Sequence, residues 1–257
     1  FPPSPDEIGA LADEIGELVP ELAARADACR SLLATHRHAE GAAYAFETLL
    51  RHARSTLVER AVVWLETTRS AGERVELVAL SEGSARRKTV ETVAGTLGVA
   101  ADRQNFVAFV SRNVGYANIY VGVQPRRSTF GGTRRGRDTD VSEHARILLD
   151  VDPRHERDAA GRDVEEPRTE WLSRRATLLN RLRPLAPAAL IATGGGVQVV
   201  FDVEPTAAPA EIGRRLKALK DVEASFESDS VHDLARIGRL PWSINVPTRN
   251  KRDRGRR

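Results

Sequence analysis

Apolar residues in the first 70 positions recur at the spacing expected of amphipathic helices. The segment 4–7 has Ser, Pro, Asp and Glu in the order typical of a helix start. Pro20 divides the stretch that follows, and the helical pattern then resumes up to Leu33. A further helix is predicted over 42–68. Residues 1–70 are therefore expected to form an all-helical N-terminal extension.

From Gly72 onward the pattern changes to short apolar runs that alternate with amphipathic segments, which predicts a mixed α/β body. The segment 106–110 fits a helix or a strand equally well. Loops are expected over 126–142, which is rich in Gly and Arg, and over 153–166, which is polar. Strands are predicted over 75–80, 118–125, 147–152, 188–193 and 197–203, helices over 88–97, 167–182, 210–222 and 229–236, and an extended segment over 240–246.

Composition narrows the class of protein. Hydrophobic residues make up 41% of the 257 positions and charged residues 29%, values that are ordinary for a folded domain with a substantial core. One cysteine excludes an internal disulfide and a zinc site built from several thiolates. No apolar run reaches the roughly 18 residues of a membrane span, so we expect a cytoplasmic protein with no membrane partner. Because the chain begins at Phe1 and lacks methionine, we expect it to be part of a longer protein.

The net charge of +3 is small, but the basic residues are clustered. Such clusters form either ordinary solvated surface or a surface that binds polyphosphate or a nucleic-acid backbone, and the charge pattern leaves both interpretations open. The tail 248–257 is expected to be disordered. The clusters are Arg86-Arg87-Lys88, a loop group of Arg126, Arg127, Arg134, Arg135 and Arg137, and a tail that includes Arg249 and Lys251.

An acidic pair ends the apolar run 147–152. Side chains alternate along a strand, so Asp150 and Asp152 are expected to point the same way. Two residues span roughly 6–7 Å along a strand, which allows both carboxylates to converge on a hard cation such as Mg²⁺ or Mn²⁺. A solvated strand end is the alternative interpretation.

Two later stretches contain polar residues of the same kind. Gly194-Gly195-Gly196 is predicted to be a tight turn between two strands, and alternation places Gln198 either in a cleft or on a solvated sheet face. The stretch 229–245 then mixes acids and arginines with apolar anchors. Asp229 would add a third carboxylate there, beside cations suited to a triphosphate.

These three stretches resemble the motifs of the archaeo-eukaryotic primase superfamily, in particular the primase-polymerases of phages and plasmids. The family's Asp-x-Asp strand is matched by Asp150-Val-Asp152, and its Ser-Gly-Gly-Gly-x-His hairpin by Thr193-Gly-Gly-Gly-Val-Gln198. Its third motif is matched by Asp229 followed by 239–245, Arg-Leu-Pro-Trp-Ser-Ile-Asn. The strand at 118–126 is similar to the one that precedes the acidic motif. The resemblance covers residues 72–257 and leaves 1–70 unexplained.

The resemblance implies a catalytic domain over 72–247, with mixed or antiparallel sheets flanked by helices around a palm similar to an RNA-recognition motif. It implies a DNA primase and polymerase that copies single-stranded DNA from NTPs or dNTPs with two Mg²⁺ or Mn²⁺ ions and no zinc. A replicative helicase is a further expected partner. The metal would be held by the catalytic Asp150, Asp152 and Asp229, the nucleotide by Thr193, Gly195, Gln198, Arg236, Arg239 and Asn245, and the template by Arg126, Arg127, Arg134, Arg135 and Lys251.

Two residues depart from the family pattern. Gln198 stands where the family usually has a His that contacts the phosphates, and Gln carries no charge. Trp242 replaces a Gly of the third motif. These departures motivate one alternative, a catalytically inactive nucleic-acid-binding scaffold. The other alternative is a metal-dependent phosphohydrolase or nuclease that uses the same acids.

Overall fold

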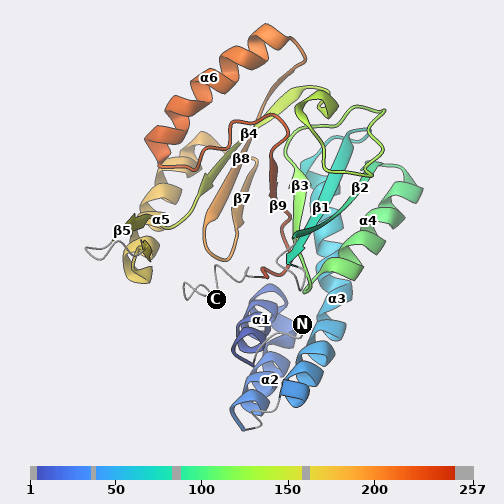
Figure 1. Ribbon diagram of the computed structural model, residues 1–257, viewed down its shortest axis with the longest axis vertical. Helices are drawn as coiled ribbons and strands as arrows, with labels where there is room; N and C mark the ends of the chain where they lie inside the picture. The colour runs from blue at the N-terminus through green and yellow to red at the C-terminus, as the bar shows by residue number, and fades with distance from the viewer. Residues whose placement is uncertain (1–4, 36–38, 83–87, 158–162, 247–257) are drawn as a thin grey trace.

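The structure, a computed structural model, describes residues 5–35, 39–82, 88–157 and 163–246. It is an α+β fold with antiparallel sheets and flanking helices (Figure 1). The first predicted cap, Ser4, and the tail 248–257 with Lys251 lie outside the described residues. In the part of the chain that is described, no helix combines the length and hydropathy that crossing a membrane would require.

The N-terminal region is helical, as predicted. Helix α1 (Pro5–Leu18) leads through the 3₁₀ helix η1 (Pro20–Leu22) into α2 (Ala23–Thr35), so the chain is interrupted at the predicted proline. Helix α3 (Ala39–Thr68) follows and is the longest of the three. Their buried side chains belong to one hydrophobic core with the first sheet, a core that includes Ile15 and Leu57 from the helices and Leu77 from a strand.

The first sheet has four strands in the order β2-β1-β3-β9, all antiparallel. Strands β1 (Arg74–Glu82) and β3 (Asn118–Gly122) agree with the prediction, and the ambiguous segment 106–110 lies in helix α4 (Ala100–Asn113). Buried residues of α3 and α4 contribute to the same core as those of β1 and β3, so these helices cover one face of the sheet (Figure 1).

The predicted helix over 88–97 is wrong, because this segment is strand β2 (Lys88–Thr96). It pairs along its whole length with β1, from Lys88 opposite Glu82 to Thr96 opposite Arg74. Its Thr and Val residues are β-branched and favour a strand. Gly95 permits close packing of α4, since a Cβ at this position would lie 2.8 Å from the Asp102 side chain.

The second sheet has three strands in the order β4-β8-β7 and carries the acidic motif. Strand β4 (His144–Val151) pairs with β8 (Val197–Thr206), and β8 forms the predicted hairpin with β7 (Ala189–Ala192). Helices α5 (Arg168–Leu182) and α6 (Pro209–Phe226) cover one face of this sheet, where Leu149 and Val199 lie in a core with Trp171 and Leu219. The opposite face turns toward the first sheet (Figure 1).

Three loop regions differ from the prediction. The segment 153–166 contains a small hairpin of β5 (His155–Arg157) and β6 (Asp163–Glu165). The segment 229–236 is not a helix, and the strand β9 (Ile237–Arg239) precedes rather than forms the expected extended segment. The Arg-rich loop contains the short 3₁₀ helix η2 (Asp138–Asp140), and η3 (Arg183–Leu185) follows α5.

Candidate active site

The two acids of β4 are joined to the third acid by the chain that follows α6. The backbone N–H of Asp229 donates to the carbonyl of Asp150 at 2.7 Å. The Ser228 hydroxyl accepts from the Asp150 N–H at 2.9 Å and donates to the Asp150 carbonyl at 3.1 Å. Segment 228–229 is thereby fixed beside the end of β4, and Asp229 is brought to Asp150 and Asp152 although it lies far along the sequence.

The nearness of the three carboxylates affects the pKa of Asp150. Burial raises its pKa to about 6, and the neighbouring charges of Asp152 and Asp229 act in the same direction. A hydrogen bond from Gln198 and the positive charge of Arg236 act against that rise in pKa. Three carboxylates therefore concentrate negative charge where a divalent cation would relieve the repulsion.

The acids supply the oxygen ligands that Mg²⁺ and Mn²⁺ favour, so their chemistry fits such an ion. Within the described segments, however, no group of three or more His, Cys, Asp or Glu side chains is gathered tightly enough to hold a metal. The residues that the sequence predicts as ligands are Asp150, Asp152 and Asp229, and their carboxylates are the groups that would hold such an ion.

The glycine turn lies directly against the acidic strand. The Thr193 hydroxyl accepts from the Gly196 N–H at 3.0 Å and closes the turn. A Cβ on Gly196 would lie 2.1 Å from Oδ1 of Asp152 and 2.6 Å from the Val151 carbonyl, so only glycine fits there. Gly194 has φ +84° and approaches the Asn245 amide. The predicted nucleotide residues Thr193 and Gly195 consequently lie beside the acids.

Gln198 is a buried connector between two elements. Its Nε2 donates to Oδ2 of Asp150 at 3.0 Å, and its Oε1 accepts from the backbone N–H of Arg239 at 2.6 Å. The register of β4 and β8, which places it opposite Asp150, explains the first bond. Gln198 therefore does not lie on a solvated sheet face, and it joins the acidic motif to β9.

Arg239 and Asn245 bind each other and a residue that the sequence did not single out. The Arg239 guanidinium donates to Oδ1 of Asn118 and to Oδ1 of Asn245, each at 2.7 Å, and lies 4.8 Å from the centre of the Tyr120 ring. Asn118 also accepts from the Val246 N–H at 2.8 Å. These bonds fix segment 239–246 against β3. The position of Asn118 at the start of a strand was the only sequence signal for this role.

Arg236 is a cation whose charge acts on Asp150. It forms an ion pair with Asp233 at 2.7 Å and donates to the Ser230 carbonyl at 2.6 Å. Its side chain is partly exposed, and its charge opposes the rise in the pKa of Asp150 that burial causes. Of the predicted phosphate contacts, Arg236 is more accessible than the buried Arg239.

Trp242 keeps the backbone conformation that suits glycine. Its φ is +63°, in the left-handed region that disfavours large side chains. The indole packs against the shared core and lies under the Arg60 guanidinium of α3, 5.0 Å from the charge centre to the ring centre. The substitution of Trp for Gly in this motif is therefore accompanied by a contact from the N-terminal helices.

A second contact from these helices reaches the same motif. Oε1 of Glu14, on α1, accepts from the backbone N–H of Asn245 at 2.8 Å. Burial raises the pKa of Glu14 to about 7, and the charge of Arg239 opposes that rise in pKa. Sequence reasoning missed this residue, because nothing in an amphipathic helix marks which polar position faces a distant loop.

The predicted template residues divide into two groups. The prediction that Arg126 contacts the template is wrong, because its side chain is fully buried and forms an ion pair with Glu76 at 2.6 Å. Arg127, Arg134 and Arg135 are exposed. Arg134 forms an ion pair with Asp140 at 2.7 Å, which leaves the surface charge of this loop smaller than its arginine content indicates.

Comparison with known proteins gives no family for this fold and site. No protein-family model, no curated protein and no solved structure matches the chain.

Proposed function

We propose that this chain is a template-dependent primase-polymerase of the archaeo-eukaryotic primase type, which copies single-stranded DNA from nucleoside triphosphates. The observation that carries the proposal is the meeting of Asp150, Asp152 and Asp229, held by the hydrogen bonds of Ser228 and Asp229 to β4. The order of the acidic strand, the glycine hairpin and the Arg-to-Asn segment supports it.

The protein groups have separate roles in this proposal. The three carboxylates would hold divalent cations, and such ions would supply Lewis-acid activation of a 3′-OH and charge neutralisation at a pyrophosphate leaving group. Arg236 provides a cation for the triphosphate at the edge of this site. The glycine hairpin allows the turn to pack closely against Asp152 and Asn245, which fixes its position beside the acids. Arg239, Asn118 and Gln198 act as positioning residues, because their polar atoms are engaged with protein partners.

The template backbone would be contacted by the exposed arginines of loop 126–142, namely Arg127, Arg134 and Arg135. Such contacts depend on counterion release, so their contribution to affinity falls as the salt concentration rises. Arg126 is excluded from this group by its burial.

A second candidate function, a catalytically inactive nucleic-acid-binding scaffold, is favoured by one observation. The oxygen of Gln198 and one of its amide hydrogens are used inside the protein. A residue engaged in this way contributes little to binding a triphosphate. The two candidates differ in their dependence on the acids, since the scaffold would bind DNA equally well without them.

The deciding experiment measures incorporation of labelled nucleotides on a primer-free single-stranded template with Mg²⁺ or Mn²⁺. The parent is compared with Asp150→Asn/Asp152→Asn and with the matched variant Asp221→Asn, whose acid is exposed on α6. We expect template-dependent products from the parent and from Asp221→Asn, and none from the double variant. DNA binding without products from any of the three proteins would overturn the polymerase proposal and favour the scaffold. Strand cutting or phosphate release without extension would favour a hydrolase.

A further inference from the structure

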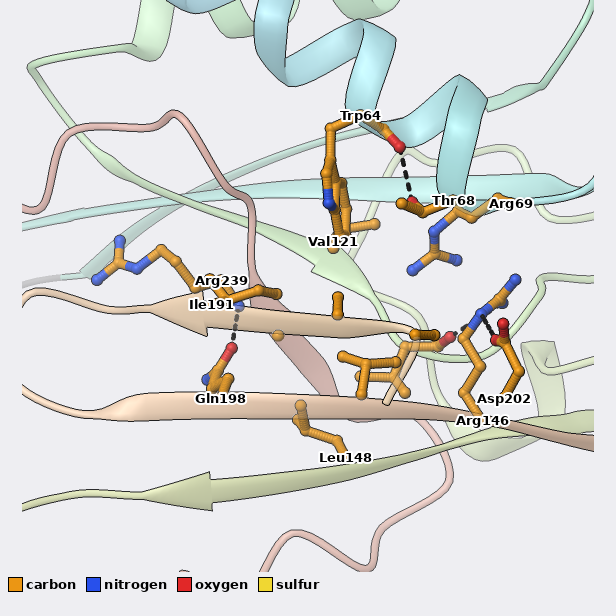
Figure 2. Close-up of a pocket in the computed structure, with 15 residues that line it drawn as sticks. Trp64, Thr68, Arg69, Val121, Arg146, Leu148, Ile191, Gln198, Asp202 and Arg239 are labelled. Atoms are coloured by element: carbon orange, nitrogen blue, oxygen red, sulfur yellow. Dashed lines mark hydrogen bonds and ion pairs between the residues drawn. The ribbon is translucent and has the colours of Figure 1, made fainter. Parts of the chain in front are cut away.

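A narrow cleft between the two sheets carries arginines that the proposed function does not use. Figure 2 shows its walls, formed by the last turns of α3, by β3 and β9 on one side and by β4, β7 and β8 on the other. Val121, Leu148 and Ile191 make much of the lining apolar, and Trp64 lies on the side of α3. Gln198 and Arg239 line it as well.

Two guanidinium groups point into this cleft, from Arg69 at the end of α3 and from Arg146 on β4 (Figure 2). Their side chains are only 4% and 8% exposed. Both bind the same buried carboxylate, Glu73, with Arg69 at 2.6 Å and Arg146 at 2.7 Å. The remaining acid is Asp202, which is 3.3 Å from Arg146 and 60% exposed.

The buried charges at this end of the cleft are not balanced, because the second acid, Asp202, is largely exposed. Two buried guanidinium groups share one buried carboxylate, and the solvent weakens the pairing of Arg146 with the exposed Asp202. Burial and the repulsion of Arg146 lower the pKa of Arg69 to about 10. The buried Nε of Arg69 has no hydrogen-bond partner within the described structure, although a buried polar atom is normally satisfied.

An oxyanion in the cleft would supply the negative charge that these buried groups lack. Arginine presents N–H donors in a planar fork that matches phosphate and carboxylate oxygens, and an anion here would pair with the surplus charge. The cleft is narrow, so its occupant is compact.

We infer that the cleft between the two sheets is a binding site for a compact oxyanion of the phosphate type, held by Arg69 and Arg146. Arg146 is four residues from Asp150 along β4, about 13 Å at the rise of a strand, so the site is separate from the acids. The ligand binds without a divalent cation, because its charge is met by guanidinium groups. The inference does not depend on polymerase activity.

The test is isothermal titration calorimetry of inorganic phosphate into the full chain, with EDTA present and the ionic strength held constant. Acetate is titrated in parallel, since a carboxylate of similar size distinguishes a general anion site from a phosphate site. We expect saturable phosphate binding that Arg69→Gln weakens at least about tenfold, the value of one charge-assisted hydrogen bond. The matched control Arg214→Gln, whose guanidinium is 76% exposed on α6, should bind as the parent does.

Arg69→Gln removes a partner of a buried acid and can fail to fold, so circular dichroism accompanies each titration. Asp202→Asn provides a second test that leaves the buried pairs intact: it removes the exposed carboxylate from Arg146 and should tighten phosphate binding. Asp150→Asn/Asp152→Asn should leave it unchanged, even if the primase proposal fails.

Each of the following outcomes would overturn the inference. The first is the absence of saturable phosphate binding by the parent. The second is equal binding by folded Arg69→Gln and Arg214→Gln, or weaker binding by Asp202→Asn. The third is loss of binding in the double acid variant under EDTA, which would place the anion near the acids and away from this cleft. Acetate binding as tight as phosphate binding would also contradict the phosphate class.

Discussion

Replacing Arg126 with alanine should damage the stability of the protein without testing nucleic-acid contact. The Arg126 side chain is fully buried, and its Nε and Nη2 donate to Oε2 of Glu76 at 2.9 and 2.6 Å. Nη2 also reaches the Ala235 carbonyl at 3.3 Å. The pair thereby connects β1 to the loop after β3 and to the segment before β9.

The expected loss of stability follows from the Glu76 carboxylate, which stays in the interior when Arg126 is replaced. In Arg126→Ala, Glu76 would stay fully buried, and within the described segments it would keep the Gly136 N–H, at 2.6 Å, as a hydrogen-bond donor. Removing one partner of a buried ion pair costs about 3–5 kcal/mol, because an unpaired charge is left in the interior. For a chain of this size each kcal/mol lowers the Tm by about 2–4 °C, so a fall of about 6–20 °C is expected.

Thermal and urea unfolding followed by circular dichroism measure this effect. Arg127→Ala is the matched control, since the neighbouring arginine is exposed and bonds a carbonyl, that of Thr139. The control should change the free energy of unfolding by less than about 1 kcal/mol. The double variant Arg126→Met/Glu76→Leu should recover much of the loss, because it removes both charges. Equal stability of Arg126→Ala and Arg127→Ala would refute the reasoning.

Three further predictions concern stability around the candidate site. The pKa of Glu14 is about 7 in the folded protein, against an ordinary value of 4.5. Between these two pH values the folded state keeps a proton that the unfolded state has released. The free energy of unfolding therefore falls as the pH rises from about 4.5 to 7. Glu14→Gln should abolish that fall and stabilise the protein at pH 8 by up to about 3 kcal/mol, measured by urea unfolding across the pH range; an unchanged pH profile would contradict it. Gly196→Ala should destabilise the hairpin beside the acids, whereas Gly213→Ala, with open space on α6, should stabilise by up to about 1 kcal/mol in thermal melts; equal effects would contradict the clash. Trp242→Gly should relieve about 1 kcal/mol of backbone strain and still lower the Tm, because the packing lost exceeds it; a higher Tm would show that strain dominates.

Segments with a strong local signal were predicted well from the sequence. The amphipathic pattern and Pro20 located the three N-terminal helices, and the Gly194–Gly196 turn located the hairpin of β7 and β8. The acidic strand was also found, because an apolar run followed by alternating aspartates is distinctive. In these places local propensity and tertiary packing favour the same structure.

Segments whose structure depends on distant partners were predicted less well. Strand β2 reads as a helix by its apolar spacing, yet pairing with β1 decides its conformation. The segment 229–236 has the composition of a short helix, but bonds from Asp229 and Ser228 to Asp150 hold it as a loop beside β4. Tertiary hydrogen bonds overrode weak local preference in both places.

Side-chain roles at the site were less predictable than its position. The family resemblance predicts that Gln198, Arg239 and Asn245 bind the nucleotide; in the structure Gln198 contacts Asp150 and the Arg239 backbone, and Arg239 contacts Asn245. The sequence could not indicate that these groups bind each other, because the donors and acceptors that satisfy a buried amide are fixed only in three dimensions. The burial of Arg126 was hidden for the same reason, since its partner Glu76 lies on a separate strand.

The N-terminal helices are part of the architecture that positions the candidate site. Helices α1 to α3 share a core with β1 and β3, and side chains of these helices, together with Arg69 directly after α3, reach the third motif or the cleft. Glu14 binds the Asn245 backbone, Arg60 lies over Trp242, and Arg69 lines the cleft between the sheets. A motif comparison that begins near residue 72 therefore omits groups that fix the third motif. Gln198 and Trp242, the two residues at which the chain differs from the motifs it resembles, are each held by a partner outside those short motifs or on another element: Gln198 by the Arg239 backbone and Trp242 by Arg60.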